Sequence, residues 1–526
     1  MARIVIVLMV SLIFLLNRID SARILGIFPH PSHSHQIFFH SLTSELSRRG
    51  HELVIFTPKV TNDTSLVNFT EISLVEAYAA GWKEIVNYSS YRELWVFFDA
   101  CYRAGVLFSE SILSHPEMEK ILNPQSDKKF DLILIQIFYV DALHALSSIL
   151  NVPMIGLTSL APIGIHHHTM GNPPLLSYIP DVMGGQPVNM NFWQRIINIY
   201  CYGRQIFEFN FIHLKKQERV LKKYFGNNAP DIRDVSKNIS LLLASTQYPI
   251  YHPRPDMPSV KLIGGLRFYK STPREKMSPR LQNILDNAKE GFIYFSLGSN
   301  VKLSQLSEEN RNVFVHVLAE LPYKVIWKCD LDDLPIKAKN IFLEKWVPQQ
   351  DILAHSNILL FLYQGGQQST EEAINNGVPL VGFPVFSDQR SNVNNVVSLG
   401  IGQKIELSSM TKESMKKTVL EVIQNPRYKK NVIELRNYIN DRMNHPMEEA
   451  IWWTEYVIRH KGAPALRNRY QDVPWYQMEG LDILIFFIIL LYALLYSMYL
   501  VTRCIISKIF LRARSSRNLD RNWKSD

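Results

Sequence analysis

The chain has 526 residues and a mass of 60.9 kDa, which is several times the length of one domain, so at least two domains with additional segments are expected. Its composition is 47% hydrophobic, 11% aromatic and 20% charged, which supplies a large core and excludes a disordered or fibrous chain. The net charge of +9 would suit an acidic partner, but five of these nine charges lie in residues 503–526. The sequence therefore predicts no nucleic-acid-binding surface.

The N-terminal segment has the pattern of a secretory signal peptide. Arg3 precedes an apolar run from Ile4 to Leu16, and the small pair Ser21-Ala22 follows. A retained membrane anchor is the alternative, but this run is shorter than the roughly twenty residues that a spanning helix needs. We therefore assign residues 1–22 to a cleaved signal peptide.

An α/β pattern begins directly after this segment. Apolar runs at 23–29 and 53–56 predict two strands, and between them a loop rich in histidine precedes a helix over 36–49. Strand-like runs recur at 132–135 and 153–157, whereas residues 160–260 are less regular and rich in aromatic side chains, which suits a hydrophobic ligand. We assign residues 23–270 to a first Rossmann-like domain.

The second half repeats the α/β pattern. A linker rich in turn-forming residues covers 264–279, and strand-like runs at 292–296, 324–328, 358–362 and 378–383 follow with helix-length segments between them. We assign residues 271–460 to a second domain. The predicted fold class is α/β, with two Rossmann-like doubly wound domains that face each other across a cleft. The sequence has no G-x-G-x-x-G after the first strand and no P-loop motif, which argues against NAD-dependent oxidoreductases and P-loop NTPases.

The C-terminal part has the features of a single membrane anchor. Residues 483–501 carry no formal charge and precede a basic tail, so the positive-inside rule places the tail in the cytosol and residues 23–480 in the lumen. We assign 461–480 to a juxtamembrane segment, 481–502 to a transmembrane helix and 503–526 to the tail. The topology predicts a single-pass type I protein of the endoplasmic reticulum membrane. This location is supported by the topology more than by a retrieval signal, because Lys524 supplies only half of a dilysine signal.

Sequons and cysteines agree with a lumenal location. The four N-glycosylation sequons all precede the membrane segment: Asn62, Asn68, Asn87 and Asn238. The cysteines Cys101, Cys201 and Cys329 allow at most one lumenal disulfide, and Cys504 lies beyond the membrane. No Cys/His spacing for zinc is present, so no metal site is predicted.

The segment from Trp346 to Glu372 carries the clearest chemical signal. Gly365 and Gly366 follow an apolar strand, and a helix beginning near Ser369 would direct free N–H groups and a positive dipole end at a ligand beside them. This pattern predicts a diphosphate site. A structural alternative stays open, because Ser369 to Glu372 also has the S-x-x-E form of a helix capping box.

Residues 346–392 resemble the signature of the membrane-bound UDP-glycosyltransferases, and most of all their insect branch: WVPQQDILAHSNILLFLYQGGQQSTEEAINNGVPLVGFPVFSDQRSN. The likeness extends to FSLGS at 295–299, to the signal peptide and to the anchor with its basic tail. It implies a GT-B fold that binds the acceptor in the N-terminal domain and the UDP-sugar in the C-terminal domain. It also implies inverting transfer of a sugar, by expectation glucose, to a hydroxyl or similar nucleophile of a small lipophilic acceptor. No metal and no cofactor besides the UDP-sugar co-substrate are implied, and a homo-oligomer is left open.

The resemblance assigns donor roles residue by residue. Trp346 would stack on uracil, and Gln349 would bind the base or the ribose. Glu372 would bind the ribose hydroxyls. The other implied contacts are those of Ser299 and Lys328 with the nucleotide, of Gln364, Gly366, Gln368 and Ser369 with the diphosphate, and of Asp388 and Gln389 with the sugar. Structural alternatives are a half-buried core position for Trp346, a solvated strand end for Lys328 and a helix cap for Asp388. Gln364 replaces the usual histidine of the family and keeps an N–H donor.

The resemblance also implies a histidine base in the first loop. Ser34-His35 stands sixteen residues before His51, as in the family, which selects His35 over His30 and His33. The alternative is that His30, His33 and His35 are all surface loop residues.

The carboxylate that usually supports this histidine is Gln136 here, at the end of a predicted strand. A glutamine can orient an imidazole through its carbonyl but cannot balance the charge of an imidazolium. A catalytically weak or inactive member that binds a hydrophobic ligand or UDP is therefore the alternative function. A third function, a cell-surface adhesion module, does not fit the two α/β domains.

Overall fold

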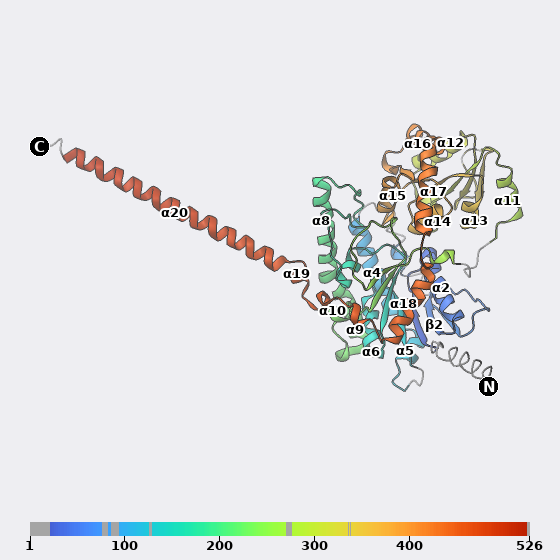
Figure 1. The fold of residues 1–526 in the computed structure, drawn as a ribbon, viewed down its shortest axis with the longest axis horizontal. Helices are drawn as coiled ribbons and strands as arrows, with labels where there is room; N and C mark the ends of the chain where they lie inside the picture. Colours follow the sequence, from blue (N-terminus) through green and yellow to red (C-terminus); the bar gives the residue numbers. More distant parts are fainter. Residues whose placement is uncertain are drawn as a thin grey trace, which may run out of the picture. The chain divides into compact units, whose positions relative to one another are not determined.

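Two parallel β-sheets form the larger of the two units into which the chain divides (Figure 1). The computed structural model describes residues 21–75, 81, 83–85, 94–125, 129–269, 276–334, 336 and 338–522. The larger unit is Met1–Arg467 and the smaller is Asn468–Asp526. The assigned signal peptide therefore lies almost wholly outside the described residues.

The first sheet has seven strands in the order β3-β2-β1-β4-β5-β6-β7, all paired in parallel. Their bounds are β1 (Arg23–Ile27), β2 (Glu52–Thr57), β3 (Phe69–Ser73), β4 (Leu132–Gln136), β5 (Met154–Thr158), β6 (Leu241–Ala244) and β7 (Val260–Leu262). The strand order reverses between β1 and β4, so the carboxyl ends of these two strands border a crevice.

The second sheet has six parallel strands in the order β10-β9-β8-β11-β12-β13. Their bounds are β8 (Phe292–Ser296), β9 (Lys324–Lys328), β10 (Ile341–Glu344), β11 (Ile358–Tyr363), β12 (Leu380–Gly382) and β13 (Gly402–Lys404). The order reverses here between β8 and β11, which places a second crevice at the carboxyl ends of those strands.

Each sheet is buried on both faces because helices cover both. In β4, Ile133 and Ile135 point into one core cluster while Leu132 and Leu134 point into another, as the two-residue period of a strand requires. The helices of the first half are α2 (His33–Arg48), α4 (Leu94–Leu113), α5 (Pro116–Leu122), α6 (Ala145–Leu150), α7 (Gly164–Met170), α8 (Phe192–Glu208), α9 (Leu214–Phe225) and α10 (Ile232–Val235). Those of the second half are α11 (Pro279–Asp286), α12 (Glu308–Ala319), α13 (Gln349–Ala354), α14 (Gln367–Asn375), α15 (Gln389–Ser398), α16 (Lys412–Gln424), α17 (Pro426–Asn440) and α18 (Pro446–Arg459).

The last of these helices returns to the first sheet. Met447 and Ile451 of α18 belong to the same buried cluster as Phe39 and Leu42 of α2, and Arg49 pairs with Glu448 at 2.5 Å. In Figure 1, α18 correspondingly lies beside α2. Helix α18 falls within the range 271–460 assigned to the second domain, yet its apolar face packs with the first.

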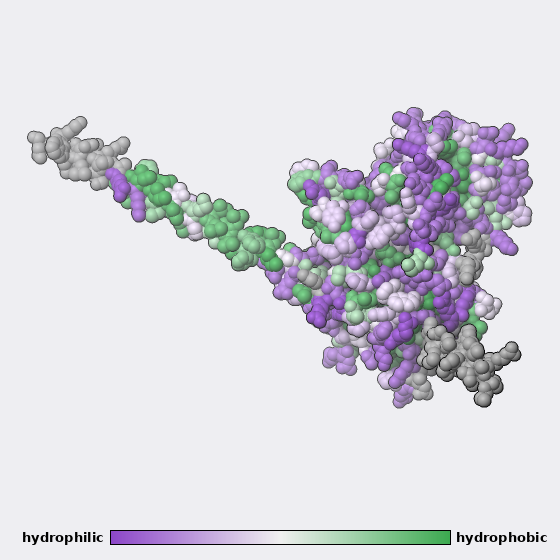
Figure 2. Space-filling view, viewed as in Figure 1, coloured by the Kyte–Doolittle hydropathy of each residue, from purple (hydrophilic) through white to green (hydrophobic). Residues whose placement is uncertain are grey.

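The smaller unit contains α19 (Trp475–Met478) and the long helix α20 (Leu481–Asn522). Among the described residues, α20 is the one helix long and apolar enough to cross a membrane, over Leu481–Arg512. Figure 2 shows apolar side chains along most of its length.

The predicted fold class, two doubly wound α/β domains and a C-terminal apolar helix, is confirmed. The strands predicted at 292–296 and 324–328 have those bounds in the structure. The predicted histidine-rich loop before residue 36 is wrong in part, because α2 begins at His33 and its first turn contains His35.

Candidate active site

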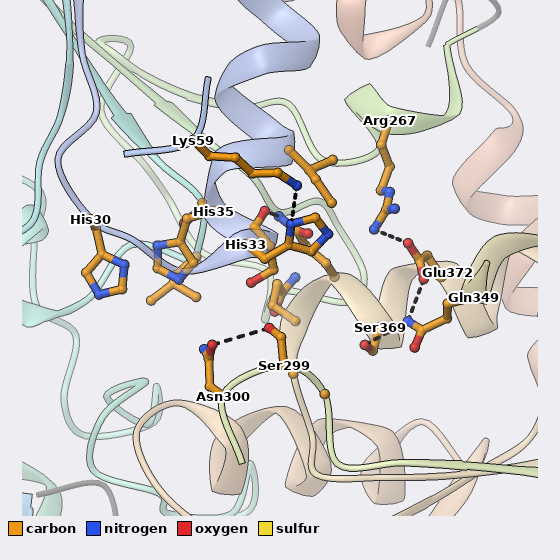
Figure 3. A pocket seen from close by; sticks show the side chains of 18 of the residues that line it. His30, His33, His35, Lys59, Arg267, Ser299, Asn300, Gln349, Ser369 and Glu372 are labelled. Atoms are coloured by element: carbon orange, nitrogen blue, oxygen red, sulfur yellow. Dashed lines mark hydrogen bonds and ion pairs between the residues drawn. The ribbon is translucent and has the colours of Figure 1, made fainter. Parts of the chain in front are cut away.

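The two crevices, at the places where the strand order of each sheet reverses, open into one cavity of about 560 Å³ that both domains line (Figure 3). From the first domain come the loop after β1 and the first turn of α2. From the second come the loops after β8 and β11 and the start of α14. The cavity thus lies where open parallel sheets place their ligands.

Hydrogen bonds fix the loop after β1. Gln36 Nε2 donates to the carbonyls of Phe28 at 2.9 Å and His30 at 2.7 Å, and the His30 backbone N–H donates to Gln136 Oε1 at 3.1 Å. Gln136 Nε2 lies 3.2 Å from His35 Nδ1. Gln136 does not line the cavity and stands behind His35. The structure corrects one expectation here, because the amide nitrogen of Gln136, and not its carbonyl, faces the imidazole.

Both buried histidines of this loop are neutral at pH 7. The rings of His30 and His35 stack with centroids 4.5 Å apart and planes inclined by 17°. Burial lowers the pKa of His35 to about 4. Burial, and then the nearby His35, lower the pKa of His30 well below its ordinary value. Neither imidazole ring therefore presents a positive charge to the cavity.

An apolar wall adjoins His35. It consists of aromatic and aliphatic side chains from both domains: Ile85, Phe97, Phe138, Leu160 and Phe386. The ring of Phe138 meets those of His30 and His35 edge-on. This part of the cavity can hold the body of an apolar molecule.

The turn after β11 places the start of α14 against the first domain. Gly365 has a φ of +95°, and a Cβ there would lie 2.7 Å from the Gln389 carbonyl, so glycine is required. Helix α14 begins at Gln367 with Gly366 as its N-cap residue and no side-chain cap. Ser369 is therefore inside the helix, and the alternative of a Ser369–Glu372 capping box is excluded. Gln368 Nε2 donates to the Ser34 carbonyl at 2.5 Å, next to His35.

The loop after β8 borders the same space. Gly298, with a φ of +80°, precedes Ser299, and Asn300 Nδ2 donates to Ser32 Oγ at 3.0 Å across the cleft. Lys328, at the end of β9, donates to the Gly298 carbonyl at 3.3 Å, and its Nζ lies 4.2 Å from the centre of the Trp346 ring. Lys328 is thus held at the cavity and is not merely a solvated strand end.

Trp346 lines the cavity with a partly exposed ring. Its side chain is 48% exposed and meets the ring of His33 edge-on, with centroids 4.9 Å apart. It is half-buried, lines the cavity and belongs to neither buried core cluster of the second domain. Beside it, Gln349 accepts from Tyr294 Oη at 3.1 Å and donates to Ser369 Oγ at 3.0 Å.

Glu372 is fully buried, with no exposed surface. Gln349 Nε2 donates to its Oε2 at 2.6 Å, and Arg267 forms an ion pair with it. Gln350 Oε1 also accepts from Arg267. Figure 3 shows Arg267, Glu372 and Gln349 as one chain of contacts.

The loop before α15 closes the cavity. Gln389 Oε1 accepts from the backbone N–H groups of Val385 at 2.9 Å and Phe386 at 3.1 Å, and Asn392 Nδ2 donates to Asp388 Oδ2 at 2.7 Å. Asp388 is the N-cap residue of α15 but makes no side-chain cap bond, so its carboxylate is not used as a cap. Burial raises its pKa to about 6.

Comparison with known proteins identifies the family. Residues 24–514 match the family model described as UDP-glucoronosyl and UDP-glucosyl transferase. The chain is 31% identical over 487 residues to UDP-glycosyltransferase UGT5 of Dactylopius coccus, with 91% of each chain covered. The chain belongs to the UDP-glycosyltransferase family. It is therefore an enzyme that transfers a glycosyl group from a UDP-sugar.

Other relatives and one solved structure agree. The enzyme is 30% identical to the ecdysteroid UDP-glucosyltransferase of Spodoptera littoralis nuclear polyhedrosis virus, over 91% of this chain and 96% of the relative. It is 28% identical to UDP-glucuronosyltransferase 2B15 of Rattus norvegicus, over 86% and 87%. The crystal structure of the glycotransferase of kitacinnamycin matches with a TM-score of 0.56 and 18% identity, over 82% of this chain and 98% of the other. The fold is thus the GT-B fold of glycosyltransferases.

The predicted donor residues of this UDP-glycosyltransferase all line the one cavity: Ser299, Lys328, Trp346, Gln349, Gln364, Gly366, Gln368, Ser369, Glu372, Asp388 and Gln389. His35 lines it as well. Sequence reasoning missed Arg267 and Asn300. The linker residue Arg267 gave no signal, whereas Asn300 directly follows the recognised FSLGS segment.

The remaining predicted sites are less informative. Asn62 and Asn68 are exposed, but Asn238 Nδ2 donates to Ser147 Oγ at 3.1 Å, and Asn87 lies outside the described residues. All four cysteines fall in the described part of the chain and are free thiols. Within that part, no group of three His, Cys, Asp or Glu side chains is arranged to hold a metal ion. Metal-independent transfer stays a prediction.

Proposed function

We propose that this UDP-glycosyltransferase transfers glucose from UDP-glucose to a nucleophile on a small lipophilic acceptor, with inversion at the anomeric carbon. The hydrogen bond from Gln368 to the Ser34 carbonyl carries this proposal, because it joins the helix start on the donor side to the residue next to His35. A diphosphate at the start of α14 would bring the adjoining sugar between His35 and the second domain.

The donor roles follow from the chemistry of each group. Trp346 would stack on uracil through its partly exposed ring, and Gln349 would bind the base or the ribose through the amide that Glu372 orients. Glu372 would accept from ribose hydroxyls once a nucleotide is present. Lys328 and the N–H groups at the start of α14 would offset the diphosphate charge, with Gln364, Gly366, Gln368 and Ser369 as the local contacts.

Asp388 favours a neutral sugar. With a pKa of about 6 its carboxyl is mostly ionised at pH 7, and it would accept hydrogen bonds from sugar hydroxyls together with Gln389. The carboxylate of a glucuronosyl group beside Asp388 would be repelled. This argument favours a neutral sugar, and among neutral sugars glucose is proposed from the likeness to UDP-glucosyltransferases.

His35 is the group proposed to contact the attacking atom of the acceptor. Its Nδ1 is engaged by Gln136, so its Nε2 is the nitrogen available toward the cavity, and the ring is neutral at pH 7. To serve a hydroxyl acceptor as a base, His35 would need the tautomer in which Nε2 carries no proton and takes the hydroxyl proton as the oxygen attacks the anomeric carbon. The apolar wall with Phe97 and Phe138 would hold the acceptor body.

The proposed location is the endoplasmic reticulum membrane. The apolar helix α20 and the basic residues that follow it support a single-pass anchor with a cytosolic tail. The catalytic domains would then lie in the lumen, beside a membrane in which lipophilic acceptors dissolve.

The test is a transfer assay with membranes that contain the full-length protein. UDP-glucose, UDP-galactose and UDP-glucuronate are each supplied with a panel of phenols and carboxylic acids, with and without EDTA. We expect transfer from UDP-glucose, unaffected by EDTA and lost in Trp346→Ala. Trp452→Ala is the matched control, because Trp452 is 49% exposed on α18 and does not line the cavity.

A second function has one observation in its favour. The amide nitrogen of Gln136 facing His35 is unsuited to supporting an imidazolium, so the protein could bind UDP and an apolar ligand with little turnover. UDP binding measured by calorimetry, with no glycosylated product from any donor, would favour this function over the first.

A further inference from the structure

The amide of Gln136 has one permitted orientation. Its Oε1 receives the backbone N–H of His30, which can only donate, and its Nε2 faces His35 Nδ1. Turning the amide over would place two donors against each other at His30. The loop that carries His30 is itself held by Gln36, so the N–H cannot turn away.

This orientation fixes the proton on His35. Because Gln136 Nε2 donates to Nδ1, that nitrogen must offer its lone pair, and the proton of the neutral ring is on Nε2. Nε2 is the nitrogen available to the acceptor. In this tautomer it donates a hydrogen bond and cannot accept a proton.

The surroundings also oppose a charged ring. A protonated His35 would direct an Nδ1–H at the Gln136 NH₂ group, and it would stand against the buried face of His30, 4.5 Å away. His30 Nδ1 accepts from Ser32 N at 3.3 Å, so that ring is held as well. The low pKa of His35 that follows from burial acts in the same direction.

We propose that the preferred acceptors reach the site already ionised, as carboxylates or acidic phenols, and that His35 serves them as an Nε2–H donor. This inference rests on the proposed function and names its acceptor class. A carboxylate oxygen forms the bond to the anomeric carbon, the bond from that carbon to the UDP oxygen breaks, and UDP leaves with the electron pair. No proton moves, and the His35 proton stays on Nε2.

Two further features fit an anionic acceptor with an apolar body. A carboxylate keeps lone pairs for the Nε2–H while one oxygen attacks, whereas a tertiary amine would have its single lone pair occupied. Arg48 and Lys59 line the same cavity, and Lys59 Nζ lies 2.7 Å from His33 Nδ1, two residues before His35. The apolar wall with Phe97 accommodates an aromatic ring.

The test compares phenylacetate, 4-nitrophenol and 2-phenylethanol as acceptors for the full-length enzyme at pH 7.5. We expect kcat/KM for the first two to exceed that for 2-phenylethanol by about 10²-fold or more, the size of a missing general base. Gln136→Asp should raise the 2-phenylethanol value about 10-fold or more and lower the phenylacetate value, because an anion at Nδ1 selects the Nδ1–H tautomer and so removes the Nε2–H donor. Gln136→Asn shortens the side chain equally without a charge and should give no gain.

Equal rates with phenylacetate and 2-phenylethanol in the unaltered enzyme would overturn the inference. An equal gain in Gln136→Asp and Gln136→Asn would do so as well. Transfer to 2-phenylethanol alone would refute the acceptor class and leave the proposed function standing. No transfer to any acceptor would refute the proposed function, and the acceptor class with it.

A different observation concerns the outer face of α8. Its inward face is mixed: Tyr202 and Ile206 belong to the core. Asn198 donates to the carbonyls of Leu176 at 3.0 Å and Ile179 at 2.9 Å, and Gln205 donates to Asp181 at 2.9 Å. Its outward residues are large and apolar, in two adjacent rows with helical spacing: Phe192, Ile196, Ile199 and Phe207 in one, and Trp193, Ile197 and Tyr200 in the other. Helix α8 thus carries exposed apolar rows in addition to a buried face that is partly apolar, whereas a helix on a soluble protein usually exposes polar residues. Figure 2 shows apolar side chains along the α8 edge.

We infer that this face of α8 contacts the interface of a lipid membrane. The inference rests on the proposed membrane location, which the apolar helix α20 supports. Trp and Tyr beside Ile and Phe are the residues that settle at the level of lipid headgroups, and Arg195 supplies a cation among them. A lipid surface would cover the exposed rows without a protein partner.

Fluorescence in lipid nanodiscs tests this inference. Ile196→Cys is labelled with an environment-sensitive dye in a full-length Cys504→Ser background, where the other cysteines are buried. We expect the dye at residue 196 to show a blue-shifted emission that brominated lipids quench. The same dye on Lys417→Cys, at an exposed position of α16, should keep the emission it has in water. A water-like dye at residue 196 in nanodiscs would overturn the inference. So would shielding in detergent that depends on protein concentration, which would indicate a second copy.

Discussion

Removal of the Glu372 carboxylate should impair both folding and nucleotide binding, because two partners depend on it. Glu372 has no exposed surface and pairs with Arg267, whose side chain is only 19% exposed. Glu372→Ala leaves a largely buried guanidinium without its counter-ion, which destabilises a protein by about 3–5 kcal/mol. For a domain of this size that corresponds to a fall in Tm of about 6–20 °C. Gln349 also loses its 2.6 Å acceptor, and UDP affinity should fall by about 1–3 kcal/mol.

Thermal unfolding in detergent and calorimetric titration with UDP measure the two effects. Arg267→Met combined with Glu372→Ala removes the stranded charge, so this double variant should regain part of the Tm while UDP affinity stays low. Wild-type UDP affinity in Glu372→Ala would refute the nucleotide role. An unchanged Tm would refute the buried ion pair.

Four further outcomes are expected. Trp346→Ala should weaken UDP binding by about 1–3 kcal/mol through lost stacking, and Trp452→Ala should not; equal effects would contradict the uracil site. Turnover should fall as pH drops through about 6, because protonated Asp388 loses its charge, and Asp388→Asn should remove this step; a step that persists there belongs to another group. His35→Ala should lower turnover with 2-phenylethanol by about 10²- to 10⁴-fold in a Gln136→Asp background, with UDP binding unchanged; unchanged turnover would rule out a base role. Protease added to sealed microsomes should remove only the few kilodaltons after Val501, and glycosidase should shift the rest; a protected tail would reverse the topology.

A strand that is buried on both faces of a sheet has a short, continuous apolar run in its sequence. The strands at 292–296 and 324–328 could be predicted from such runs. The start of α2 could not, because His33 and Ser34 have low helix propensity and the packing of the turn decides the boundary. The donor residues could be gathered from one continuous segment. Arg267 could not, since its partner Glu372 is about a hundred positions away and only the fold brings them together.

The same limit applies to Gln136. Its position behind His35 follows from the strand end, but the direction of its amide depends on the backbone N–H of His30, which the sequence alone does not orient. A carboxylate at this position would accept from both His30 N and His35 Nδ1, and His35 Nε2 would then be free to take a proton. The glutamine accepts from His30 and must donate to His35. One change of side chain therefore reverses the polarity of a single hydrogen bond and converts the group that faces the acceptor from a proton acceptor into a donor, without moving the ring.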